Sequence, residues 1–123
     1  MKKTVLILMA FLLLSATCWA QEKAAPKGAE MTVTGMLTCT FCTMPGAAKC
    51  SKECCQSCIK GGDPATLSDA KGNLYLLLTG EQGKPVMTPE RMELLESKVK
   101  VTGIMVKRGG LQAIYVKKLE KAQ

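Results

Sequence analysis

Six of the seven cysteines fall within twenty residues, and this cluster constrains the fold more than any other feature of the 123-residue chain. The pattern is C-x2-C followed by C-x3-C-C-x2-C, and the chain contains no histidine. Thiols at this density either ligate a soft metal or are joined in disulfides. The six residues are Cys39, Cys42, Cys50, Cys54, Cys55 and Cys58.

The first twenty residues have the order of a secretory signal peptide. Lys2 and Lys3 precede the apolar run 5–14, and small residues surround a predicted cleavage site after Ala20. That run is shorter than the ~20 residues of a membrane-spanning helix, and no later segment is longer. The sequence therefore predicts an exported chain, periplasmic or secreted, without a membrane span. Cys18 offers the alternative of a lipoprotein that is cut before a lipidated cysteine.

The remainder has room for one domain. Residues 21–30 are polar and small, as in a flexible leader, and residues 31–123 form the predicted domain, with a Cys-rich insertion at 39–62. Removal of Lys2 and Lys3 leaves 15 basic and 10 acidic residues, a charge of +5. Only three aromatic residues remain, too few for a base-stacking surface. Together with export, this predicts no nucleic-acid partner.

Hydrophobic patterning outside the cluster is mostly that of strands. Residues 31–38 alternate between apolar and polar, and Gly35 inside them predicts a bend or bulge. Further strands are expected around Leu67 and at 74–79, 98–107 and 111–119, the last two joined by a hairpin at 108–110. Thr88 and Pro89 have the residue types of an N-cap and first turn, and predict a short helix before the fourth strand.

The cysteine segment itself is expected to be a helix that begins at Pro45 and ends at Gly61. At 100° per residue, Cys50, Cys54 and Cys58 share one face, and Cys55 lies at its edge. Charged residues occupy the opposite face. The segment therefore predicts an amphipathic helix whose buried stripe is made of thiols.

Five strands with a helix between the third and fourth is the element order of an OB-fold, a small Greek-key barrel. The sequence thus predicts a mainly β protein, with the Cys-rich helix inserted after strand 1 and a short helix before strand 4. A split α+β sheet is the alternative. Loops in the position of this insertion commonly bind ligands in OB-folds.

Three stretches resemble a group of small exported bacterial proteins of unassigned function. They are VTGMLTC, CCQSCIKGGDPATLSDAKGNLYLLL and KVKVTGIMVKRGGLQAIYVKKLE, and together they cover most of the predicted domain. The resemblance implies export and an OB-like barrel that carries a cysteine-bearing helix. It implies no established activity.

Metal ligation is the first interpretation of the cluster, with zinc, copper(I) or an iron–sulfur cluster as candidates. The best tetrad by spacing is C-x2-C-x12-C-x2-C, and Cys54 is an alternative to Cys55 within it. Covalent haem is excluded because no C-x-x-C-H occurs. Met44 is a minor candidate as a copper ligand. The tetrad consists of Cys39, Cys42, Cys55 and Cys58.

Disulfides are the second interpretation, because export places the thiols where they oxidise. Only Cys39 and Cys42 lie outside the predicted helix, so complete pairing requires a bridge within 50–58 that would distort it. This favours metal. The predicted function is a non-catalytic exported domain that binds a soft metal. A disulfide-stapled module for an envelope protein and a thiol–disulfide carrier are the alternatives.

Overall fold

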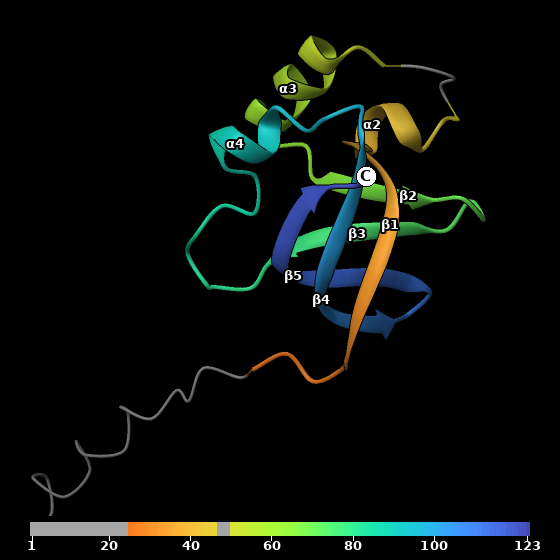
Figure 1. Ribbon diagram of the computed structural model, residues 1–123, viewed down its shortest axis with the longest axis vertical. Helices are drawn as coiled ribbons and strands as arrows, with labels where there is room; N and C mark the ends of the chain where they lie inside the picture. Colours follow the sequence, from red (N-terminus) through yellow and green to blue (C-terminus); the bar gives the residue numbers. More distant parts are fainter. Residues whose placement is uncertain (1–24, 47–49) are drawn as a thin grey trace, which may run out of the picture.

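The computed structural model describes residues 25–46 and 50–123, and its body is a closed five-stranded barrel (Figure 1). The order around the barrel is β1-β2-β3-β5-β4, with β1 paired to β4 to close it. β3 and β5 run parallel, and the other pairs are antiparallel. The predicted OB-like fold is confirmed. The strands are β1 (Ala29–Cys39), β2 (Ala65–Asp69), β3 (Leu74–Thr79), β4 (Lys98–Arg108) and β5 (Leu111–Lys121).

The first strand begins at Ala29, inside the segment predicted as a leader. The predicted signal peptide, its cleavage site and Cys18 lie outside the described residues. In the described part of the chain, no helix has both the length and the apolar character needed to cross a membrane.

Two glycines let the long strands bend around the barrel. A Cβ at Gly35 would lie 2.3 Å from the carbonyl oxygen of Ser68, and one at Gly103 would lie 2.1 Å from that of Tyr115. The β4–β5 pairing shifts register between Thr102 and Gly103, which marks a bulge. The bend predicted at Gly35 is therefore a place where only glycine allows the backbones to approach.

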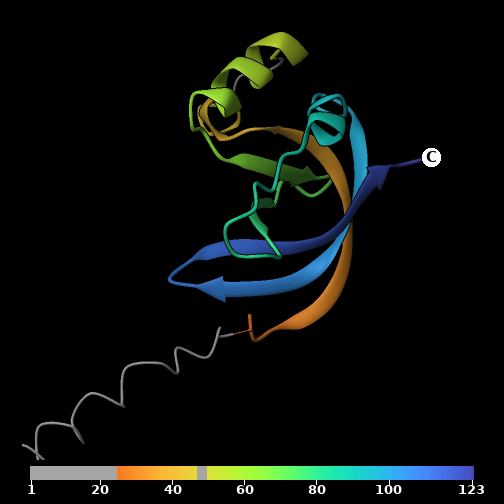
Figure 2. The same ribbon diagram turned by 90° about the vertical axis from the view of Figure 1, so that its left-hand side faces the viewer.

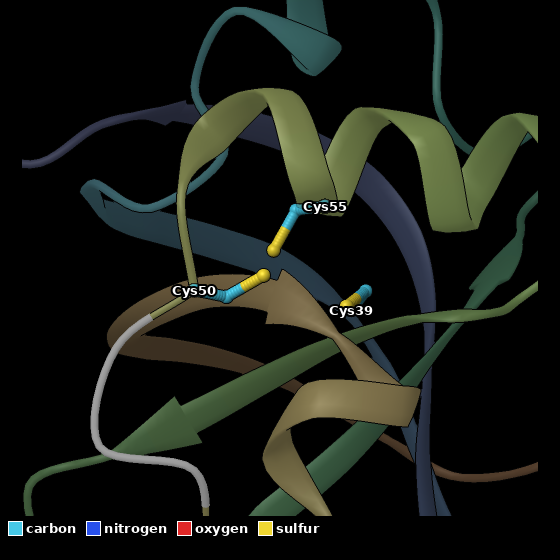
Figure 3. A group of neighbouring side chains, drawn as sticks. All are labelled: Cys39, Cys50 and Cys55. Carbon is cyan, nitrogen blue, oxygen red and sulfur yellow. The ribbon is translucent and has the colours of Figure 1, made fainter.

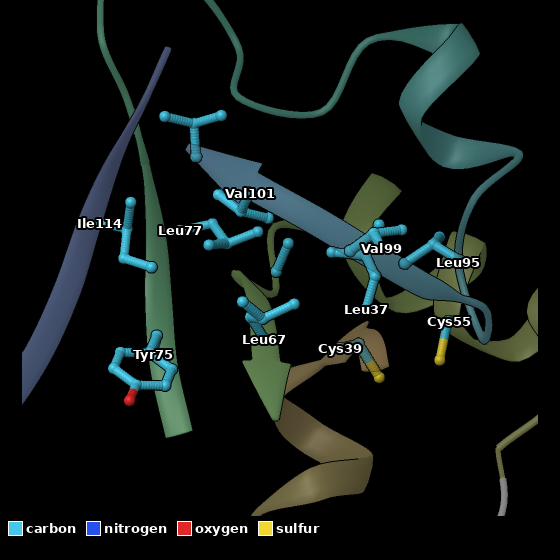
Figure 4. Close-up of a cluster of buried hydrophobic side chains, with 12 residues drawn as sticks. Leu37, Cys39, Cys55, Leu67, Tyr75, Leu77, Leu95, Val99, Val101 and Ile114 are labelled. Atoms are coloured by element: carbon cyan, nitrogen blue, oxygen red, sulfur yellow. The ribbon is translucent and has the colours of Figure 1, made fainter. Parts of the chain in front are cut away.

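Branched aliphatic side chains from all five strands fill the barrel (Figure 4). Two thiols, Cys39 and Cys55, complete this core at one end, and each is 0% exposed. The largest fully buried aliphatic side chains are Leu37, Leu67, Leu77, Leu95, Val99, Val101 and Ile114.

Three short helices gather at that end of the barrel, away from the β4–β5 hairpin (Figures 1 and 2). They are α2 (Thr40–Thr43), α3 (Lys52–Lys60) and α4 (Pro89–Met92). The start of α4 is as predicted: Pro89 opens the helix, and the Thr88 hydroxyl accepts a hydrogen bond from the amide of Arg91.

The predicted start of the cysteine helix at Pro45 is wrong. α3 begins seven residues later, at Lys52, because the hydroxyl of Ser51 caps it by accepting the amide of Cys54 at 3.1 Å. Pro45 instead lies in the turn after α2, a short helix that the sequence did not predict. The predicted end at Gly61 is confirmed. Cys50 is consequently outside the helix.

Replacing Gly103 with alanine is expected to destabilise the barrel, because the new Cβ collides with the backbone of β5. The free energy of unfolding falls by ~1–3 kcal/mol, measured by urea denaturation of the reduced chain. Gly61→Ala is the matched control: Gly61 has φ −78°, and its effect stays below ~1 kcal/mol. An equal loss in both variants contradicts the close approach.

Candidate metal centre

All six cysteines of the cluster meet at the helical end of the barrel. Cys39 is the last residue of β1, and Cys42 follows it in α2. Cys50 stands immediately before the cap of α3, and that helix carries the other three. The cluster therefore has one anchor on a barrel strand and one on a helix that packs across the strand's end.

The sulfur atoms form three groups of three, and within each group the Sγ atoms lie within 4.8 Å of one another. Two groups share each of the residues Cys39, Cys42 and Cys50, whereas each of the three cysteines of α3 belongs to one group. The three groups are Cys39–Cys50–Cys55, Cys39–Cys42–Cys58 and Cys42–Cys50–Cys54.

Figure 3 shows the first of these groups. The sulfur of Cys50, which lies just before α3, and the sulfur of Cys55, in the first turn of α3, point toward each other. Cys39 lies beside them at the end of β1. Within the third group, Cys42 Sγ lies 3.0 Å from Cys50 Sγ.

The predicted tetrad does not form a single group of four. Cys39, Cys42 and Cys58 come together, but Cys55 joins Cys39 and Cys50 instead. The alternative tetrad with Cys54 fails as well, because Cys54 groups with Cys42 and Cys50. The cause is the late start of α3, which leaves Cys50 free to enter the cluster between the two C-x2-C pairs.

The predicted orientation of the helix is also wrong. Cys55, placed at the edge of the buried stripe, is completely buried, and Cys54, placed within the stripe, is exposed. The face that packs on the barrel runs through Cys55, Cys58 and Ile59, at spacings of three and four residues. Lys52 and Gln56 tie the helix to the end of α4: Lys52 forms an ion pair with Glu93, and the Gln56 amide donates a hydrogen bond to the Met92 carbonyl.

Hydrogen bonds join the two ends of the insertion to each other, between the end of β1 and the start of β2. The Thr40 hydroxyl donates to the carbonyl of Pro64 at 2.7 Å, and the amide of Phe41 donates to the Asp63 carboxylate at 2.8 Å. These bonds join the start of α2 to the chain that enters β2. These hydrogen bonds therefore help to position Cys39 and Cys42.

Glu96 is a polar neighbour of the cluster that the sequence analysis missed. The thiol of Cys55 donates to its carboxylate at 3.1 Å, and the Thr38 hydroxyl lies 3.6 Å from the same sulfur. Glu96 has a left-handed φ of 58°, and its amide donates to the Leu37 carbonyl at 2.8 Å. No sequence pattern marked it, since its position follows from that turn and from the pairing with β1.

The environment of the cluster shifts the pKa values of its thiols in opposite directions. Burial opposes ionisation of Cys39, but hydrogen bonds from the amide and thiol of Cys42, and from Cys55 and Cys58, lower its pKa. Burial raises the pKa of Cys55 to about 11, and the Glu96 contact adds to this. Burial, together with the hydrogen bond and charge of Cys39, raises the pKa of Cys58 to about 12.

Cys42 and Cys50 also ionise less readily than an ordinary thiol. Hydrogen bonding to Cys42, followed by burial, raises the pKa of Cys50. The contact with Cys50 lowers the pKa of Cys42, but its hydrogen bond to Cys39, burial and the charge of Cys39 outweigh this, so the net change is upward. Cys39 is thus the thiol of the cluster whose pKa is lowered, whereas the pKa values of Cys42, Cys50, Cys55 and Cys58 are raised.

Met44, the minor copper candidate, lies at the C-cap of α2 with 67% of its surface exposed, and Phe41 nearby is 73% exposed. These two side chains form an exposed apolar rim next to the cluster. Their exposure fits a surface role more closely than a ligand buried with the thiols.

Comparison with known proteins returned no matching family model, no matching curated protein and no matching solved structure. The resemblance to small exported bacterial proteins therefore stays a prediction.

Exchanging Glu96 for glutamine is expected to lower the pKa of Cys55, because the negative charge that favours the protonated thiol is removed. The thiolate ultraviolet absorbance of the reduced, metal-free chain then rises at lower pH than in the original protein. Glu93→Gln is the control, since Glu93 contacts Lys52 and Gln56 but no thiol. Identical titrations of both variants contradict the assigned contact.

Proposed function

We propose that the protein is an exported, non-catalytic domain that binds a soft metal ion through its clustered cysteines. The observation that carries this proposal is the convergence of six thiols into groups whose sulfurs lie within 4.8 Å of one another. Zinc, copper(I) and an iron–sulfur cluster all take thiolate ligands.

The order of ligation follows from the acidity of the thiols. Cys39, whose pKa is lowered, supplies the first thiolate on a rigid strand end. A bound cation then favours ionisation of its neighbours and displaces their protons. Cys39 is held by the barrel and Cys55 by the core, so two of the ligands need little reorganisation.

The non-catalytic part of the proposal is supported by composition. The chain has no histidine to act as a general base. Acidic groups beside the cluster have structural partners: Asp63 accepts the Phe41 amide, and Glu96 accepts the Cys55 thiol. An excess of basic residues suits a site that gains negative thiolates.

A disulfide-stapled module for an envelope protein is the second candidate, and a specific observation favours it. The bridge required within 50–58 was predicted to distort the helix, and that is wrong because Cys50 precedes α3. Each of the three cysteines of α3 is grouped with two cysteines from outside α3. All six thiols can therefore be joined to a neighbour in three disulfides, and there are two ways to do so. The rim of Phe41 and Met44 supplies an apolar surface for such a partner.

The thiol–disulfide carrier remains the third alternative, and the same arrangement supports it. Both complete pairings use the same six thiols, so thiol–disulfide exchange can convert one pairing into the other.

Native mass spectrometry of the exported protein, isolated without reductant or chelator, separates the candidates. The metal proposal predicts a bound metal and thiols that become alkylatable only after chelation. The staple predicts a metal-free chain six hydrogens lighter than the reduced form, since six cysteines make three bridges. The second result overturns metal binding in the mature protein.

Metal affinity is expected to fall as the pH is lowered. The pKa values of Cys55 and Cys58, about 11 and about 12, mean that binding must displace protons at neutral pH. Chelator competition on the reduced chain between about pH 8 and pH 5 measures the slope. An affinity that does not change over this range contradicts thiolate ligation.

A further inference from the structure

We propose that the six cysteines hold three copper(I) ions in one cluster with shared sulfurs. This inference rests on the proposed soft-metal function and adds the identity and number of the ions. It follows from how the three sulfur groups are connected rather than from the number of cysteines.

The groups form a ring in which each shares one cysteine with each of the other two. Cys39 links the first and second groups, Cys42 the second and third, and Cys50 the third and first. With one ion in each group, these three sulfurs each bridge two ions. The ring then alternates metal and sulfur, and every ion also has one terminal ligand. The terminal ligands come from α3 and are Cys54, Cys55 and Cys58.

Three thiolates per ion suit copper(I) better than the other soft metals. Zinc and iron–sulfur clusters take four protein or sulfide ligands around each ion. Among the described residues, every His, Cys, Asp or Glu group with metal-binding geometry has three members. Copper(I) is soft, prefers thiolates, and is stable with three of them.

The reaction balances without any oxidant or reductant. Three Cu⁺ ions replace six thiol protons, so three positive and six negative charges leave a cluster of charge −3 and release six protons. Copper keeps its oxidation state throughout. Glu96 is unfavourable for a negatively charged cluster, because the hydrogen bond that it accepts from Cys55 is lost when that thiol ionises. Its side chain is half-buried and can turn toward water.

The six cysteines differ in how deeply they are buried. Cys39 and Cys55 are completely buried, Cys42, Cys50 and Cys58 are half-buried, and Cys54 is exposed. Among the bridging residues only Cys39 is completely buried, and the third group opens to solvent at Cys54. Copper enters and leaves through the group that contains Cys54.

The test loads the reduced full-length chain anaerobically with copper(I), under competition from a copper(I) chelator, and counts bound ions by native mass spectrometry. The expected number is three, one for each group. Cys54→Ser removes a terminal ligand and leaves two complete groups, so two ions remain. Cys50→Ser removes a bridging ligand and leaves only Cys39–Cys42–Cys58, so one ion remains.

Both substitutions lie at positions outside the fully buried core, and circular dichroism of each metal-free variant checks the fold. X-ray absorption of the loaded chain is expected to show sulfur-only ligation and a copper–copper distance. Equal losses from the two variants, or one isolated copper or zinc per chain, overturn the cluster and leave the proposed function standing. Failure of the folded, reduced chain to retain copper(I), zinc or a reconstituted iron–sulfur cluster overturns both.

Discussion

The structure depends on the way one end of the barrel is closed by sulfur. Cys39 ends the strand β1, and Cys55 of α3 packs over it where an aliphatic side chain would otherwise complete the core. A buried free thiol packs like a small hydrophobic group. The same atoms therefore serve the folding of the barrel and the assembly of the site. This double role explains why the insertion is held so firmly against the strands.

That arrangement also sets the chemistry of the cluster. The barrel fixes Cys39, hydrogen bonds lower its pKa, and burial keeps the neighbouring thiols Cys55 and Cys58 protonated. Thiolate ligands are polarisable and bind soft cations more strongly than hard ones, and a metal bound by Cys55 or Cys58 would have to displace their protons. Oxidation to disulfides competes for the same sulfurs, and the Sγ atoms of Cys42 and Cys50 lie 3.0 Å apart.

The sequence was a good guide to the barrel and a poor one to the detail of the site. Alternation and glycine position predicted the strands, since Gly35 and the β4–β5 hairpin obey local rules. The start of α3 was misplaced because Pro45 and Ser51 both carry helix-start signals, and the helix begins after the cap formed by Ser51. That one error placed Cys50 on the predicted helix, although it lies before α3. Glu96 reached the site through long-range pairing with β1, which no local pattern encodes.

The central claim is that a soft metal occupies the space between these sulfurs. Anomalous X-ray diffraction from crystals of the reduced chain grown with copper(I) tests it most directly. The account predicts anomalous peaks within bonding distance of the Cys39, Cys42 and Cys50 sulfurs, at the helical end of the barrel. Copper peaks only at other surface sites, with continuous density joining cysteine sulfurs in pairs, would contradict it.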